Sequence, residues 1–168
     1  MSGAKVGVND GETMKTISAP FLNHQWLEDF SLGDRFEYGC WEMKIEDMLA
    51  FARLYDPEPF HLDEIKARAL GWDGVIASGP QISAIWRRMS KDAFPNAQII
   101  VSPGWDSIRW FKPVYAGDVL RSETEITEAR QLKSRDHEGM IKLDNRILRG
   151  EELVSQLSST WFMRCRPA

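Results

Sequence analysis

Residues 139–148 read Gly-Met-Ile-Lys-Leu-Asp-Asn-Arg-Ile-Leu, and this stretch decides the fold. Apolar and charged residues alternate along it with a period of two, which is typical of a strand with one buried face. Three more segments look extended, residues 98–111, 118–132 and 152–166. In the last, one face carries Leu157, Ser159, Trp161, Met163 and Cys165. The turns between these segments are short, so we expect antiparallel neighbours in one sheet.

Before these strands in the chain, apolar residues recur with the spacing of amphipathic helices. The most apolar stripe consists of Ile82, Ile85, Trp86 and Met89, which predicts a buried central helix with Ser78 as its N-cap. A strand is predicted over residues 35–43, with Phe36, Tyr38 and Cys40 on one side. An amphipathic helix follows over 45–54, and a short one over 64–70 that Asp63 caps. The predicted fold is therefore α+β, an antiparallel sheet with helices on one face.

Composition limits the classes of function. The chain has 168 residues, 43% of them hydrophobic, and a net charge of -4. It contains no run of Lys and Arg for nucleic acid and no apolar stretch long enough to span a membrane. The N-terminus lacks the pattern of a secretory signal, and Cys40 and Cys165 are too few for a disulfide framework, so we expect a cytoplasmic protein. We expect an N-terminal arm over residues 1–23 and a single domain over 24–168.

Residues 55–61, Tyr-Asp-Pro-Glu-Pro-Phe-His, are the strongest functional signal. Asp56 and His61 are side chains suited to transfer protons near neutral pH. Pro57 and Pro59 fix φ and remove backbone donors, so we expect Asp56, Glu58 and His61 on an irregular loop outside any regular helix or strand. Such a loop is a usual place for catalytic residues.

Other polar residues have simpler interpretations. Ser78 lacks the Gly-x-Ser-x-Gly setting of a nucleophile and fits a helix cap better. Asp63 is expected to cap a helix or to orient His61. His24 and His137 are expected on the surface, and no His or Cys spacing predicts a metal site. Arg87, Arg88, Arg109 and Lys112 are candidates for binding phosphate, with a solvated or ion-paired surface as the simpler alternative.

The order of these elements resembles the MaoC-type hot-dog dehydratases, which include the (R)-specific enoyl-CoA hydratases. The resemblance extends over about residues 25–166. Its specific parts are the Asp-x-x-x-x-His spacing in residues 51–63, Gly-Val-Ile-Ala-Ser-Gly at 74–79, residues 108–114, and the later Gly117-Asp118. It implies a sheet wrapped around the helix that begins near Ser78, an overhanging catalytic segment, and a homodimer or higher homo-oligomer.

The resemblance also implies an activity. Substrates of this family are acyl thioesters, commonly of coenzyme A, and the reaction adds water to a 2,3-unsaturated acyl group or removes it. It implies no metal and no cofactor beyond the coenzyme A of the substrate. Asp56 and His61 take the catalytic positions, and Gly79 takes the position whose N–H holds the thioester carbonyl, with Ser78 beside it in the substrate-binding turn. Which of the two catalytic residues is the base stays open.

Two departures from the family pattern leave alternatives. Glu58 stands where the hydratase signature usually has Asn, and Ser78-Gly79-Pro80 stands where it has His-Gly-Met. One alternative is a hot-dog thioesterase, although those enzymes generally carry a carboxylate on the central helix and residues 79–86 hold none. The other is a subunit that binds acyl thioesters without catalysis.

Overall fold

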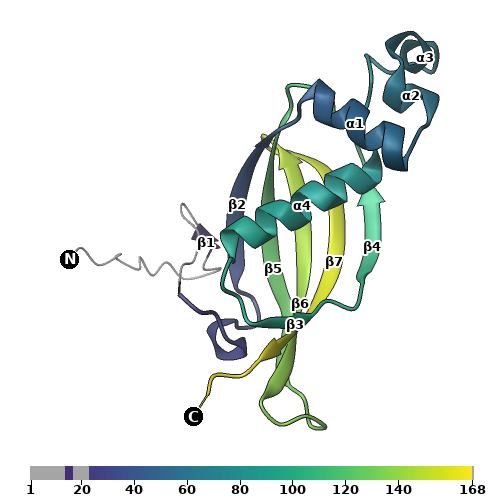
Figure 1. Ribbon diagram of the computed structural model, residues 1–168. Helices are drawn as coiled ribbons and strands as arrows, with labels where there is room; N and C mark the ends of the chain where they lie inside the picture. The colour runs from purple at the N-terminus through teal and green to yellow at the C-terminus, as the bar shows by residue number, and fades with distance from the viewer. Residues whose placement is uncertain (1–13, 17–22, 168) are drawn as a thin grey trace.

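One curved sheet forms most of the molecule (Figure 1). The computed structural model describes residues 14–16 and 23–167. Within them the sheet has seven strands in the order β1-β2-β5-β6-β7-β3, with β4 also paired to β7. The strands are β1 Met14–Thr16, β2 Arg35–Glu42, β3 Ile99–Val101, β4 Trp105–Trp110, β5 Val119–Gln131, β6 Glu138–Arg149 and β7 Glu152–Arg164. All pairings are antiparallel except β1 with β2, so the predicted antiparallel sheet is confirmed for the segments from which it was inferred.

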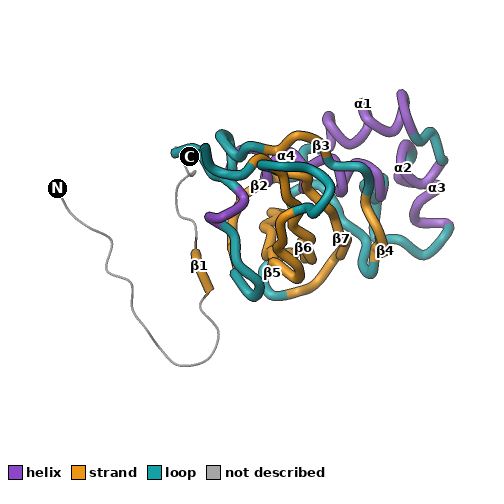
Figure 2. The backbone as a smooth tube through the Cα atoms, turned by 90° about the horizontal axis from the view of Figure 1, so that it is seen from below, coloured by secondary structure: helices purple, strands orange, loops and turns teal. Residues whose placement is uncertain are grey.

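Helix α4 lies across one face of this sheet, and the sheet curls around it (Figures 1 and 2). The helices are the 3-10 turn η1 Leu27–Asp29, α1 Ile45–Tyr55, α2 Pro59–Leu62, α3 Glu64–Ala69 and α4 Gly79–Ala93. Helices α1, α2 and α3 gather beyond the sheet, near the start of α4 (Figure 1). The arrangement confirms the predicted hot-dog fold, an α+β structure with an overhanging segment.

The core lies between α4 and the inner face of the sheet. Helix α4 buries its predicted stripe, Ile82, Ile85, Trp86 and Met89. Each such side chain stabilises the fold by roughly 1.5–3 kcal/mol when fully buried. The inner faces of β6 and β7 are the predicted ones. Their buried residues include Ile141, Leu143, Asn145, Ile147, Leu157, Ser159, Trp161 and Met163, and Cys165, just after β7, is buried as well.

Two strand predictions were wrong in detail. Residues 98–111 form two strands, β3 and β4, because Ser102-Pro103-Gly104 interrupts the pairing with β7. Cys40 is exposed, although it was expected on the same side of the strand as Phe36 and Tyr38, which are buried. Gly39 adopts φ +86 at a bulge, where the register with β5 shifts between Tyr38 and Trp41, and this shift turns Cys40 outward.

The predicted arm, residues 1–23, falls largely outside the described residues. Of its described part, Met14–Thr16 pairs with Arg35–Glu37 of β2. Among the described residues, none of the helices combines the length and the apolar character that crossing a membrane requires.

Candidate active site

The segment carrying Asp56 and His61 begins where α1 ends. Asp56 follows the last turn of α1 and donates its N–H to the Ala52 carbonyl at 3.0 Å. The Glu58 N–H then binds the Asp56 carbonyl at 2.8 Å, and the His61 N–H binds the Glu58 carbonyl at 2.9 Å. His61 lies in α2, so the prediction that it avoids a regular helix was wrong. Pro59 occupies the start of that helix, where its fixed φ suits the turn and no N–H is needed.

Asp56 and His61 form a pair, as their spacing predicted. His61 Nε2 lies 3.4 Å from Asp56 Oδ2. His61 Nδ1 lies 2.7 Å from the Ile76 carbonyl oxygen, which can only accept, so Nδ1 carries a proton and Nε2 is the nitrogen available for exchange. The His61 side chain is only 8% exposed, whereas the Asp56 side chain is 28% exposed. The pair therefore combines a fixed imidazole with a carboxylate that water reaches.

Ser78 occupies the predicted N-cap position of α4, but its side chain does not cap the helix. Its hydroxyl instead donates to Asp56 Oδ2 at 2.7 Å. The predicted capping role of this side chain was therefore wrong, and a contact that sequence did not indicate joins the start of α4 to the Asp56 segment. That contact spans 22 positions in the chain, and no local pattern encodes it.

Gly79 is the first residue of α4, as predicted. Its N–H forms no hydrogen bond with any of residues 14–16 and 23–167. The N-terminal end of a helix carries a partial positive charge, so a free N–H there favours a developing oxyanion. The indole of Trp110 packs against this glycine so closely that a Cβ at Gly79 would lie 2.7 Å from Trp110 Cε2.

A pocket of about 270 Å³ adjoins this constellation. Gly79 and His61 line this pocket. Asp56 does not line it but contacts His61, which does. Most of the remaining lining is apolar: Trp72, Ile76, Ala77, Ile82, Trp110, Phe111, Lys112, Pro113 and Val114. Sequence reasoning did not assign the aromatic residues to the site. These aromatic side chains are exposed on an edge strand and in loops, and the alternation of residues 98–111 does not indicate which of them face a pocket.

The other predictions for polar residues are resolved more simply. Asp63 caps α3 by accepting from the Lys66 N–H at 3.1 Å. Arg88 pairs with Asp92, and Lys112 Nζ lies 3.7 Å from Glu152 Oε1, so the ion-paired alternative is confirmed for both. Both His24 and His137 are exposed. The described part of the chain holds no cluster of three His, Cys, Asp or Glu side chains that suits a metal ion.

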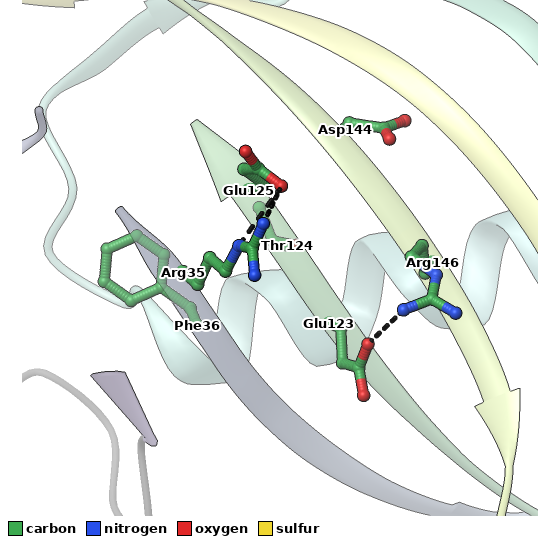
Figure 3. A pocket seen from close by; sticks show the side chains of 7 residues that line it. All are labelled: Arg35, Phe36, Glu123, Thr124, Glu125, Asp144 and Arg146. Atoms are coloured by element: carbon green, nitrogen blue, oxygen red, sulfur yellow. Dashed lines mark hydrogen bonds and ion pairs between the residues drawn. The ribbon is translucent and has the colours of Figure 1, made fainter. Parts of the chain in front are cut away.

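A second depression, of about 170 Å³, lies on the outer face of the sheet (Figure 3). Charged side chains of β2, β5 and β6 line it, and they mostly satisfy one another. Arg35 pairs with Glu125 at 3.2 Å, and Arg146 pairs with Glu123 at 2.7 Å. Helix α4 lies behind these strands in Figure 3, so the depression is separate from Asp56 and His61. Its ion pairs are those of a solvated sheet face, and we assign no chemistry to it.

Comparison with known proteins gives one consistent family. The family model described as MaoC like domain matches residues 35–145. The uncharacterized protein YdeM of Bacillus subtilis (strain 168) is 31% identical over 103 residues, which cover 61% of this chain and 73% of that protein. A mitochondrial 3-hydroxyacyl-acyl-carrier-protein dehydratase, FERN of Solanum lycopersicum, is 29% identical over 91 residues. That match covers 54% of this chain and 53% of the plant enzyme, about half the length of each.

The solved structures agree with this result. The crystal structure of the MaoC-like dehydratase from Rhodospirillum rubrum superimposes with a TM-score of 0.79 and 32% sequence identity. The superposition covers 86% of this chain and 99% of that one. The matched residues 35–145 include the Asp56–His61 pair, Ser78, Gly79 and the aromatic wall of the pocket. On this evidence the chain belongs to the MaoC-like domain family.

Proposed function

We propose that the protein is an acyl-thioester hydratase or dehydratase that adds water across a 2,3 double bond, or removes it, with enoyl-CoA as the substrate class. The observation that carries the proposal is the 3.4 Å approach of His61 Nε2 to Asp56 Oδ2 beside the start of α4. Two proton-transfer groups and a free N–H donor are what this reaction needs, and the family to which the chain belongs contains dehydratases.

The proposed reaction uses one water molecule held by the Asp56–His61 pair. The water oxygen bonds to the β-carbon of the enoyl group while one of the two residues accepts a water proton. The π electrons of the double bond move onto the carbonyl oxygen as an enolate, which the Gly79 N–H stabilises. A proton from the other residue then reaches the α-carbon, and the reverse sequence expels water. No metal or redox cofactor takes part in this scheme.

A thioesterase fits the geometry less well. Helix α4 carries a single acidic residue, Asp92, at its C-terminal end, where it pairs with Arg88. The carboxylate that contacts His61 of the pocket is Asp56, and the two side chains together form a proton-transfer pair, which hydration at the β-carbon needs. A subunit that binds acyl thioesters without catalysis would need none of these proton-transfer contacts.

We also propose that the protein works as a homodimer. Strand β4 has β7 as its sole pairing partner among the described residues, and β3, β4 and the residue after β4 expose apolar side chains. The exposed ones are Ile100, Val101, Trp105, Trp110 and Phe111. An unpaired strand edge with an apolar surface favours association, and a second copy of the chain would cover it. Light scattering after size exclusion measures this directly, and a strict monomer would contradict it.

The experiment that tests the activity offers trans-2-enoyl-CoA thioesters of short and medium chain length to the purified protein. Hydration appears as loss of the enoyl absorbance, and thioester hydrolysis appears as release of free thiol. We expect hydration without thiol release. Asp56→Asn and His61→Ala are expected to abolish hydration while the circular dichroism spectrum stays that of the wild type.

The matched controls are Asp63→Asn and His137→Ala, which change a carboxylate and an imidazole outside the pocket. They are expected to retain wild-type rates. Hydration that persists in both Asp56→Asn and His61→Ala would refute the assignment, and thiol release alone would favour the thioesterase. Binding of the thioester without any turnover would favour the non-catalytic subunit.

A further inference from the structure

We propose that Ser78 is a positioning residue that fixes the carboxylate of Asp56 by occupying Oδ2, so that Oδ1 is the oxygen that accepts the proton from water. This inference rests on the proposed function and assigns a role within that site. It starts from a serine at a helix start whose hydroxyl bonds to the candidate catalytic carboxylate rather than to the helix.

The start of α4 explains why the hydroxyl is available. An N-cap side chain usually accepts from the N–H groups of the second or third helical residue. Here the second residue is Pro80, which has no N–H, and Ser78 forms no capping bond with the third. The Ser78 hydroxyl therefore points to Asp56 Oδ2 at 2.7 Å, as a donor to a carboxylate.

Burial makes this contact persistent. Ser78 is 1% exposed, so bulk water does not compete for its hydroxyl. A buried hydroxyl without a partner is destabilising, and the bond to Asp56 is the one its side chain forms within the described residues. The carboxylate is thereby held from the α4 side, although Asp56 itself follows the end of α1.

The two oxygens of Asp56 then have different surroundings. Oδ2 accepts from Ser78 and lies 3.4 Å from His61 Nε2, whereas Oδ1 accepts no hydrogen bond from residues 14–16 and 23–167. The imidazole is fixed in the same way, since the Ile76 carbonyl holds Nδ1 at 2.7 Å. Ser78 and Ile76 thus orient one member of the pair each. Oδ1 is left to take the water proton, and delivery to the α-carbon uses a second imidazole proton, carried on His61 Nε2 while Nδ1 keeps its own.

The test compares Ser78→Ala with the wild type on a trans-2-enoyl-CoA substrate. Loss of orientation is expected to lower kcat by about 10- to 100-fold. KM and the Kd of saturated butyryl-CoA, which cannot react, are expected to stay within about twofold, because the hydroxyl bonds to Asp56 and Ser78 is not among the residues that line the pocket. Ser78→Thr retains the hydroxyl and is expected to recover most of kcat.

The control is Ser90→Ala, which removes another buried hydroxyl of α4, one without a partner in the described structure. It is expected to leave kcat unchanged. A role in helix stability alone would instead lower the melting temperature of Ser78→Ala and weaken butyryl-CoA binding, and that result would overturn the inference. Unchanged kcat in Ser78→Ala, with an active wild type, would also overturn it and leave the proposed function standing. If the wild type shows no hydratase activity, both the role of Ser78 and the proposed function are refuted.

Discussion

The indole ring of Trp110 packs against Gly79, the first residue of α4. The backbone of Gly79 does not require glycine, because its φ lies outside the left-handed region. The packing around Gly79 does require glycine, since a Cβ at this position would lie 2.7 and 2.8 Å from two ring carbons of Trp110. The ring that excludes a side chain at Gly79 is also a wall of the pocket that His61 lines.

Gly79→Ala is therefore expected to displace the Trp110 ring and disturb the site. Alanine usually stabilises a helix relative to glycine by about 1 kcal/mol, so a lower melting temperature would be diagnostic of the collision. We expect that decrease, together with a loss in kcat/KM of roughly 100-fold. In Gly79→Ala/Trp110→Ala the collision is absent, and the melting temperature should exceed that of Gly79→Ala.

Gly74→Ala is the matched control, because no atom lies within 4 Å of a Cβ there and its φ is not left-handed. This variant should melt no lower than the wild type. Equal melting temperatures for Gly79→Ala and the wild type would show that the ring moves without cost.

Glu58→Gln is expected to change kcat and KM by less than about threefold, although Glu58 lies two positions from Asp56. The Glu58 side chain is exposed and forms no hydrogen bond or ion pair with Asp56 or His61, and charges in water interact by only about 1 kcal/mol even at 4 Å. What Glu58 supplies to the segment is backbone, the N–H to Asp56 and the carbonyl to His61, and Gln retains both. Steady-state kinetics decide the point: a tenfold change would mean that the Glu58 carboxylate acts on the reaction.

Asn145→Ala is expected to lower the free energy of unfolding by roughly 1–3 kcal/mol, the cost of leaving buried polar groups unpaired. Asn145 is fully buried, and its Oδ1 accepts from Thr124 Oγ1 at 2.7 Å. Its Nδ2 donates to the Leu157 carbonyl and to Ser159 Oγ, both at 3.2 Å. Urea denaturation measures the change. Asn23→Ala, at an exposed asparagine, is the control and should lie within about 0.5 kcal/mol of the wild type.

Burial raises the pKa of the Tyr38 phenol, against a smaller opposing effect of its hydrogen bond to Thr124. In the unfolded chain this phenol loses its proton near pH 10, whereas in the folded protein it keeps it to a higher pH. The unfolded state therefore binds fewer protons above about pH 10, and the free energy of unfolding falls as pH rises. The contribution of the protonated Tyr38 phenol to the free energy of unfolding is therefore fully present below pH 10 and is lost as the pH rises above it.

Tyr38→Phe removes this contribution. Urea denaturation between pH 10 and 11 should give a slope for the wild type that is steeper than that of Tyr38→Phe by at most about 1.4 kcal/mol per pH unit, the value for one proton. At pH 7 the variant should be less stable by about 1 kcal/mol, because it lacks the hydrogen bond to Thr124. Parallel slopes would mean that the Tyr38 phenol ionises as readily in the folded protein as in the unfolded chain.

The features that sequence predicted are those that local periodicity encodes. The alternation of residues 139–148 marks the inner face of β6, and the stripe from Ile82 to Met89 marks the buried face of α4. The prediction failed where one residue changed the geometry. Gly39 introduced a bulge that turned Cys40 outward, and Pro103 divided one expected strand into two.

Part of the site was predictable for the same reason. Asp56 and His61 are close in sequence, so their pairing follows from a short segment. The Ser78 contact with Asp56 and the Trp110 contact with Gly79 join segments that are distant in the chain, so the tertiary structure alone brings them together. The capping prediction for Ser78 used a local propensity, and the contact with Asp56 overrode it.

The overhanging segment, residues 45–77, has a consequence for how this protein diversifies. It buries few side chains, which are Met48, Ala52, His61, Ala67 and Ala77, whereas the long strands β5, β6 and β7 and helix α4 hold most of the core. Substitutions in the overhang therefore cost little of the stability that keeps the chain folded. Exposed positions of the overhang can therefore change at little cost in folding stability, whereas Ser78 and Gly79 of the same site lie at the start of α4, the helix that holds much of the core.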